Sequence, residues 1–334
     1  MSETILKVED LKTSFMTSSG EVQAVRGVSF EVHKGEILGI VGESGSGKSV
    51  TSMSILRLLA DTARIKNGKI EFEGTDLTKV SDKQMREIRG QKIAMVFQDP
   101  MSSLNPLIPV GKQVAEMIHV HHPEMKRDEL QAATLELFRE VRIPEAEKRL
   151  KSYPHEFSGG MRQRVMIANH PDLLIADEPT TALDVTIQHQ ILKQMRSLQE
   201  EYGTSIIFIT HDLGVVAELC DRVVVLYGGL VMEEAEINDL FENPLHPYTM
   251  GLLASIPGLT KDKSERLQSI PGSPPDMTKP PKGCPFARNI CAAECPPFVQ
   301  VGSRQARCWL LQPDAPAEGN PLHEKLAEAE RKAH

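Results

Sequence analysis

The sequence lacks any long, uninterrupted apolar run. No stretch of about 18 or more uncharged apolar residues occurs, and even the segment 205–232 is broken by charged side chains. The first residues also lack the basic start and the apolar stretch of a secretory signal. We therefore expect a chain that spans no bilayer and stays inside the cell.

Excess positive charge is also missing. The formal net charge is -8, so no broad cationic surface is expected for the phosphates of nucleic acids. The 334 residues, 40% hydrophobic and 25% charged, have the composition of an ordinary globular protein with room for one large domain or two smaller ones. Proteins are therefore the expected partners, and nucleic acid is not.

Strand-like and helix-like segments alternate along most of the chain, which predicts an α/β fold. Strands are expected at 6–32 (broken at 18–20), 36–41, 69–72, 93–97, 172–176, 205–209 and 222–227, and helices at 49–59, 127–141 and 186–202.

The amino-acid composition changes twice along the chain. Residues of about 101–168 are rich in helix formers and predict a helical subdomain within a first domain, 1–258. Beyond it, the proline pairs at 274–275, 280–281 and 296–297 disfavour long helices and ladder-paired strands, which predicts a loop-rich extension, 259–334.

Residues 42–49, Gly-Glu-Ser-Gly-Ser-Gly-Lys-Ser, match the phosphate-loop pattern G-x-x-x-x-G-K-[ST] between an expected strand and an expected helix. Lys48 would reach the β- and γ-phosphates of a nucleotide, and the Ser49 hydroxyl would ligate Mg²⁺. A flexible glycine turn is the alternative, but a chance match is on the order of 1%. Kinases, GTPases and helicases share this pattern. The nucleotide-binding residues expected here are Gly42, Ser44, Gly45, Gly47, Lys48, Ser49 and Thr51.

Two further motifs narrow the class of nucleotide-binding protein. An apolar strand at 173–176 ends in Asp177 and Glu178, the form of a Walker B element: Asp177 would help to hold Mg²⁺, and Glu178 would polarise the attacking water as general base. At Ser158, Gly159 and Gly160 a serine and two glycines open a helix and form a second expected anion site, useful if a phosphate arrives from elsewhere.

Residues 157–163, Phe-Ser-Gly-Gly-Met-Arg-Gln, resemble the signature of ABC ATPases, with Phe and Met in place of the usual first Leu and fifth Gln. With the phosphate loop (the Walker A motif) and the Walker B element in family order, residues 1–258 resemble an ABC ATPase. The phrases at 97–106, 243–249 and 271–275 resemble the bacterial oligopeptide, dipeptide and nickel importer subgroup. The fold implied is a RecA-like mixed sheet with an antiparallel β subdomain and a helical subdomain.

The resemblance also implies roles for four single residues. Gln98 matches the Q-loop glutamine that contacts Mg²⁺ and water, Asp184 belongs to the D-loop, and His211 matches the switch histidine at the γ-phosphate. Phe15 would stack on adenine, although a core phenylalanine is an alternative reading. Taken alone, each of these residues could be purely structural.

The partners follow from the same resemblance. Two ATPases, commonly different proteins in this subgroup, would close head to tail on ATP at the cytoplasmic face of the membrane. They would drive two permease subunits supplied by an extracytoplasmic peptide-binding protein. The cargo itself is not readable: peptides are expected first, then nickel or another small solute.

One departure from the family concerns the segment between Ser158 and Asp177, which is about one helical turn shorter than usual. Either the signature helix is truncated, or about four residues are missing from the numbering. We favour the second reading, and a continuous peptide link between Ala168 and Asn169 would contradict it.

Four of the five cysteines lie close together near the C-terminus: Cys284, Cys291, Cys295 and Cys308. Disulfides would be reduced inside the cell. A zinc site usually shows paired C-x2-C knuckles, which are absent here. Irregular spacing in loops favours a [4Fe-4S] cluster over zinc or plain thiols. The family resemblance implies the same, because some peptide-importer ATPases carry such a cluster in this region.

Non-transport ABC ATPases are the rival class. The DNA-repair type contains long heptad coiled coils, and no sustained heptads occur between Lys48 and Phe157. A translation-associated protein would need a second cassette. A non-catalytic nucleotide-binding module is disfavoured because Glu178 and His211 are both present.

Overall fold

We analysed a computed structural model of the chain, which describes residues 3–97, 104–166, 171–181, 184–256, 277, 295–302, 304–312 and 322. The chain forms two compact units, which we describe separately. The first unit comprises Met1–Glu3, His33–Glu36 and Lys79–Ile207, and the second comprises Thr4–Val32, Ile37–Thr78 and Phe208–His334.

An antiparallel sheet in the second unit is built from strands β1 (Thr4–Thr17), β2 (Gly20–His33), β4 (Ala63–Phe72) and β5 (Thr75–Asp76), in the order β2-β1-β4-β5. Leu6 and Val8 of β1 are buried on either side of half-buried Lys7. The pairing with β4 is irregular between Glu9 and Lys12, so the next buried side chain is Leu11 and the alternation shifts by one residue at this bulge. The expected strand pair at 6–32 is confirmed, although each strand is longer than predicted.

The second unit also contains strands in the order β11-β12-β10-β9-β3. Their bounds are Val299–Val301, Arg304–Ala306, Leu230–Glu236, Arg222–Tyr227 and Ile37–Val41, respectively. All five residues of β3 are buried, and β3 runs parallel to β9, whereas β9 and β10 are antiparallel. The sheet is therefore mixed. Helices α1 (Lys48–Ile55), α8 (Leu213–Leu219), α9 (Ile237–Glu242) and α10 (Pro247–Ala254) belong to the same unit.

The C-terminal region corrects one expectation. We predicted no ladder-paired strands after residue 258, but β12 pairs with β10 through Glu233 opposite Ala306 and Glu234 opposite Gln305. The proline pair at 296–297 ends just before β11, so the prolines delimit these strands and do not interrupt them. A small apolar cluster joins this region to residues before it: Leu245, Val301, Ala306, Cys308, Leu311 and Leu322.

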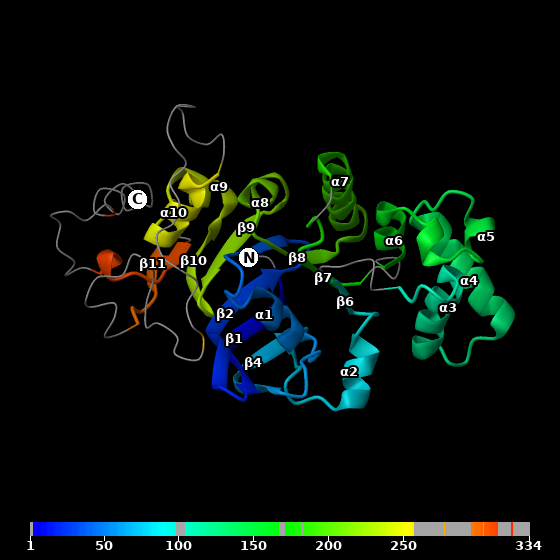
Figure 1. Ribbon diagram of the computed structural model, residues 1–334, viewed down its shortest axis with the longest axis horizontal. Helices are drawn as coiled ribbons and strands as arrows, with labels where there is room; N and C mark the ends of the chain where they lie inside the picture. The colour runs from blue at the N-terminus through cyan, green and yellow to red at the C-terminus, as the bar shows by residue number, and fades with distance from the viewer. Residues whose placement is uncertain are drawn as a thin grey trace. The chain divides into compact units, whose positions relative to one another are not determined.

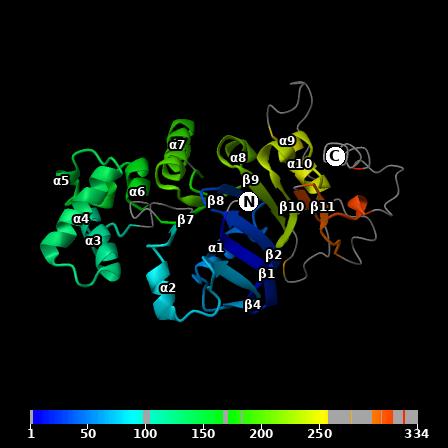
Figure 2. The same ribbon diagram turned by 180° about the vertical axis from the view of Figure 1, so that it is seen from behind.

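In the first unit, β6 (Ile93–Val96) pairs in parallel with β7 (Leu173–Asp177). The helices are α2 (Asp82–Ile88), α3 (Val110–His121), α4 (Arg127–Glu140), α5 (Ala146–Arg149), α6 (Gly159–Met166) and α7 (Val185–Tyr202). Figures 1 and 2 show α3, α4, α5 and α6 gathered together. Phe138 and Phe157 meet edge to face in their shared core, with ring centroids 6.2 Å apart.

Strand β8 (Ser205–Thr210) gives its first three residues to the first unit and its last three to the second. All six of its residues are buried, as expected for a central strand. No helix within the described residues has the length and apolarity needed to cross a membrane.

Candidate functional site

The phosphate loop connects the buried strand β3 to helix α1. Gly42 and Gly47 have φ angles of 153° and 101°, and both are enclosed. A Cβ on Gly42 would lie 2.2 Å from the carbonyl oxygen of Leu226, and one on Gly47 would lie 2.6 Å from that of Ala24. Glycine is therefore required at both positions by backbone conformation and by space.

Lys48 points into this loop. Its Nζ donates to the carbonyl oxygens of Gly42 at 2.7 Å and Glu43 at 3.0 Å, and the side chain is buried. Ser46 Oγ is also buried and has no hydrogen-bond partner in the described part of the chain. A buried ammonium held by two loop carbonyls, together with the positive N-terminus of α1, suits a phosphate group.

The other expected residues of the loop differ in exposure. Ser44 and Gly45 are exposed, and Ser49, the second residue of α1, is half-buried. Thr51 is fully buried, and its hydroxyl donates to the carbonyl of Gly47 at 2.9 Å. Thr51 thus supports the loop from inside.

Two contacts to the loop were not anticipated from the sequence. The amide of Gly229, in the turn between β9 and β10, donates to the carbonyl of Ser46 at 3.0 Å. The amide of Glu43 donates to the hydroxyl of Tyr248 at 3.3 Å. Residues 243–249 resemble a phrase of the importer subgroup, but no local signal in the sequence connects Tyr248 with a loop about 200 positions away.

His211 and Phe15 belong to the same unit as the loop. His211 is exposed and follows β8 directly, and the next residue, Asp212, caps α8 by accepting from the amides of Gly214 at 2.8 Å and Val215 at 3.4 Å. Phe15 lies on β1, opposite Ala63 on β4, and is half-buried.

The two acidic residues after β7 lie in the first unit. Asp177 ends the strand and is buried. Glu178 adopts φ 49°, a left-handed conformation that costs a non-glycine residue about 1–2 kcal/mol, and its Oε2 accepts from the Thr181 hydroxyl at 3.0 Å. Strained backbone of this kind concentrates at functional sites.

The signature segment also lies in the first unit. Ser158 Oγ accepts from the amide of Met161 at 3.3 Å, as an N-cap of α6 does. A Cβ on Gly159 or Gly160 would meet nothing within 4 Å, so the described chain itself does not require glycine there. Phe157, the unusual first residue of the segment, is buried in the helical core.

Arg162 holds the residues that precede α6 in place. Its buried guanidinium donates to the carbonyl oxygens of Pro154 at 2.8 Å and Phe157 at 2.9 Å. Asp184 caps α7 by accepting from the amide of Ile187 at 3.0 Å, and its side chain is exposed.

Several predicted features lie outside the described residues: Gln98, Cys284, Cys291, and the link between Ala168 and Asn169. Of the four clustered cysteines, the structure describes Cys308, which is buried, and Cys295, which is exposed and lies 3.6 Å from Arg307 Nη1. Within the described ranges, no group of three or more His, Cys, Asp or Glu residues is arranged to hold a metal ion.

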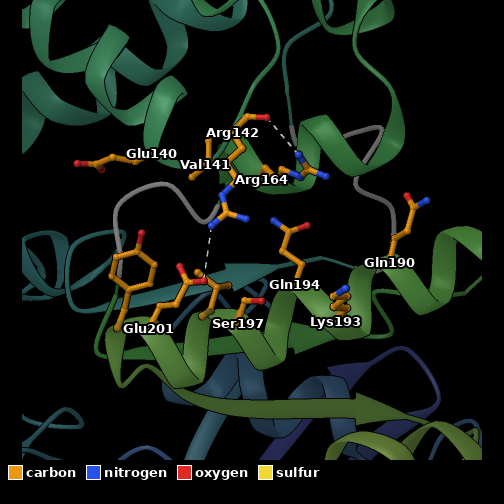
Figure 3. A pocket seen from close by; sticks show the side chains of 11 residues that line it. Glu140, Val141, Arg142, Arg164, Gln190, Lys193, Gln194, Ser197 and Glu201 are labelled. Carbon is orange, nitrogen blue, oxygen red and sulfur yellow. Dashed lines mark hydrogen bonds and ion pairs between the residues drawn. The ribbon is translucent and has the colours of Figure 1, made fainter.

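A separate cavity of about 250 Å³ lies in the first unit between the end of α4, α6 and one face of α7 (Figure 3). Arg142 connects its walls: its carbonyl accepts from Arg164 Nη1 at 3.2 Å, and its guanidinium lies 3.8 Å from Glu201. None of the residues lining the cavity belongs to the nucleotide motifs.

Two family models match the chain. Residues 25–181 match the ABC transporter family, and residues 232–295 match the C-terminal region of oligopeptide/dipeptide transporters. The second match covers the 243–249 phrase and extends into the four-cysteine segment. The subgroup resemblance found in the sequence is therefore confirmed.

Curated relatives match over almost the whole chain. The oligopeptide transport ATP-binding protein OppD of Bacillus subtilis is 52% identical over 324 residues, which cover 93% of this chain and 90% of the relative. The dipeptide transport ATP-binding protein DppD of Lactococcus lactis is 49% identical over 326 residues, with coverage of 94% and 93%.

The dimeric, post-hydrolysis ATP-binding cassette MJ0796, solved with ADP and Pi, is similar in structure, with a TM-score of 0.60 and 28% identity. The similarity covers 70% of this chain and 98% of the cassette, which confirms the predicted fold class. The chain belongs to the ABC transporter ATP-binding proteins, in the group with the oligopeptide/dipeptide transporter C-terminal region, and it is an ATPase of the ABC type.

Proposed function

We propose that this chain hydrolyses ATP to power a bacterial importer of short peptides, acting on separate permease subunits at the cytoplasmic face of the membrane. The observation that carries the proposal is the phosphate loop, in which Lys48 Nζ lies within 3.0 Å of two loop carbonyls and the buried Ser46 hydroxyl has no hydrogen-bond partner among the described residues. Peptide as cargo is supported by the names of the relatives.

ATP is the substrate, and its phosphates suit the loop because the Lys48 ammonium and the N-terminus of α1 supply positive charge there. Lys48 would hold the β- and γ-phosphates, and Phe15 would stack on adenine. Ser49, Asp177 and Gln98 would hold Mg²⁺, which neutralises phosphate charge when bound. Glu178 would orient and deprotonate the attacking water, and His211 would contact the γ-phosphate.

A second ATPase subunit is part of the proposal. Ser158, Gly159 and Gly160 stand at the N-terminus of α6, where a Cβ on either glycine would meet nothing of the described chain, and such an open terminus suits the phosphates of a nucleotide held by a partner. Asp184 would lie at the same subunit contact. We expect the partner to be a different protein, and we expect two permeases and an extracytoplasmic peptide-binding protein to complete the complex.

The cysteine cluster is the remaining element. We propose that Cys284, Cys291, Cys295 and Cys308 hold a [4Fe-4S] cluster with a structural or regulatory role. Thiolate ligands in loop-rich sequence suit iron and sulfide.

Reconstitution tests the proposed transport. The chain, its partner ATPase, the permeases and the binding protein are placed in lipid vesicles, and uptake of labelled trialanine is measured with and without ATP. We expect ATP-dependent uptake, and ATP hydrolysis stimulated by peptide-loaded binding protein. Stimulation and uptake with Ni²⁺ but not with peptides would replace the proposed cargo with nickel.

A further inference from the structure

We infer that Tyr248 is a positioning residue for the phosphate loop, through which the segment 245–248 helps to set ATP affinity. The inference rests on the proposed nucleotide-binding role of the loop. It gives a physical task to the Leu-His-Pro-Tyr sequence at 245–248, which the nucleotide motifs leave unexplained.

The first link is a buried carboxylate. Glu233 lies on β10 with no exposed surface, and it accepts from the amides of Leu245 at 2.7 Å and His246 at 2.9 Å. Burial raises the pKa of Glu233, while these hydrogen bonds and nearby Arg304 oppose the rise. Because two main-chain donors bind one side chain, residues 245 and 246 are held at a fixed place on the sheet.

The second link is the start of α10. His246 Nδ1 accepts from the amide of Tyr248 at 3.0 Å, and Pro247 occupies the first helical turn, where its missing N–H costs nothing. Burial lowers the pKa of His246 to about 4, so the imidazole is neutral near pH 7 and Nδ1 is available as an acceptor. The direction in which the Tyr248 side chain leaves the helix is thereby fixed.

The third link is the tyrosine itself. Tyr248 is fully buried, its ring packs against Tyr227 with centroids 4.8 Å apart, and its hydroxyl accepts from the amide of Glu43 at 3.3 Å. Tyr227 ends β9, and the turn that follows bonds the same loop through Gly229 and Ser46. Tyr248 therefore holds the loop at Glu43, and Gly229 holds it at Ser46; both residues lie outside the phosphate-loop motif.

Such a contact should change the affinity for ATP more than the rate of hydrolysis. A loop whose amides are already ordered loses less conformational freedom when a phosphate arrives, so its affinity is higher. No atom of Tyr248 needs to touch the nucleotide. Loss of the hydroxyl should therefore weaken ATP binding and leave the rate of the bound complex nearly unchanged.

The test is Tyr248→Phe in the full chain, which removes the hydroxyl and keeps the ring. Tyr202→Phe at the exposed end of α7 is the matched control. We expect the KM and the Kd for Mg-ATP to rise about three- to tenfold in Tyr248→Phe, with kcat within about twofold of the wild type. Hydrogen exchange of the Glu43 amide should become faster, and Tyr202→Phe should behave as the wild type.

Two results would overturn the inference: unchanged ATP affinity in Tyr248→Phe, or a loss that tracks a large fall in Tm without faster exchange at Glu43. Either would leave Tyr248 as a core side chain only. Failure of the wild-type chain to bind ATP would instead refute the proposed function. The variants therefore separate the two questions.

Discussion

Glu178 and Thr181 are joined by a hydrogen bond in which the threonine hydroxyl donates to Glu178 Oε2 at 3.0 Å, while the backbone of Glu178 is left-handed with φ 49°. The backbone conformation sets where the carboxylate leaves the chain, and the hydrogen bond sets its rotamer. A base that must meet a water molecule at one angle benefits from both restraints.

Glu178→Gln should therefore retain ATP binding and lose hydrolysis, by about 10²- to 10⁴-fold, because the amide keeps the shape but cannot take a proton. Steady-state phosphate release and nucleotide binding measure the two effects separately. Full hydrolysis in this variant would exclude Glu178 as the general base.

Gly47→Ala should abolish detectable ATP binding. Its new Cβ would lie 2.6 Å from the carbonyl oxygen of Ala24, so the loop would have to shift. Gly20→Ala is the control: φ there is also positive, at 121°, but a Cβ meets nothing within 4 Å. The control should lose about 1–2 kcal/mol of stability and keep its affinity. Equal losses of ATP binding in both variants would show that backbone strain, and not crowding in the loop, is responsible.

The stability of the fold should fall in acid because of His246. The pKa of this side chain is about 4 in the folded state and near 6.5 when unfolded, so between these values the unfolded chain binds more protons. The contribution of His246 to the free energy of unfolding is complete above pH 6.5. It declines by about 2–3 kcal/mol as the pH falls towards 4. Urea unfolding at pH 7 and pH 4.5 measures the decline.

His246→Asn supplies the comparison, since Asn can accept the Tyr248 amide without titrating. The raised pKa of Glu233 acts with the opposite sign, stabilising the fold as the pH falls, and it is common to both proteins. The wild type should therefore lose more stability than His246→Asn between the two pH values. Equal losses of stability in the two proteins would show that His246 is not the source of the acid sensitivity.

Anaerobically purified protein should be brown, with about four iron and four sulfide per chain. Cys295→Ser should lower the iron content and the visible absorbance, whereas Cys220→Ser, on a buried cysteine outside the cluster, should not. A colourless, iron-free preparation that contains zinc would replace the cluster with a zinc site.

Most of the fold could be predicted from local patterns in the sequence. The strand at 37–41, the helix from Lys48 and the strand at 173–177 were predictable because apolar runs meet glycine-rich or acidic turns at their ends. The phosphate loop was predictable for the same reason. Strand β12 was not, because three residues such as Arg304–Ala306 have no periodicity to read, and their partner β10 is distant in sequence.

The contact between Tyr248 and Glu43 was unpredictable in a similar way. It depends on the β9–β10 hairpin and the start of α10 being brought to the phosphate loop, which is a property of tertiary packing. The 243–249 phrase marked the segment as characteristic of a subgroup, but only the structure assigns a partner to its tyrosine.

The pairing of β12 with β10 has a practical consequence for anyone who shortens this protein. Cutting the chain after residue 258, where the expected first domain ends, would strip β10 of its outer neighbour and leave main-chain donors and acceptors unpaired along it. It would also uncover Leu245 and the sheet around Glu233. Such an open, apolar edge invites strand-to-strand association between molecules, so the shortened protein should precipitate at concentrations where the full chain stays dissolved.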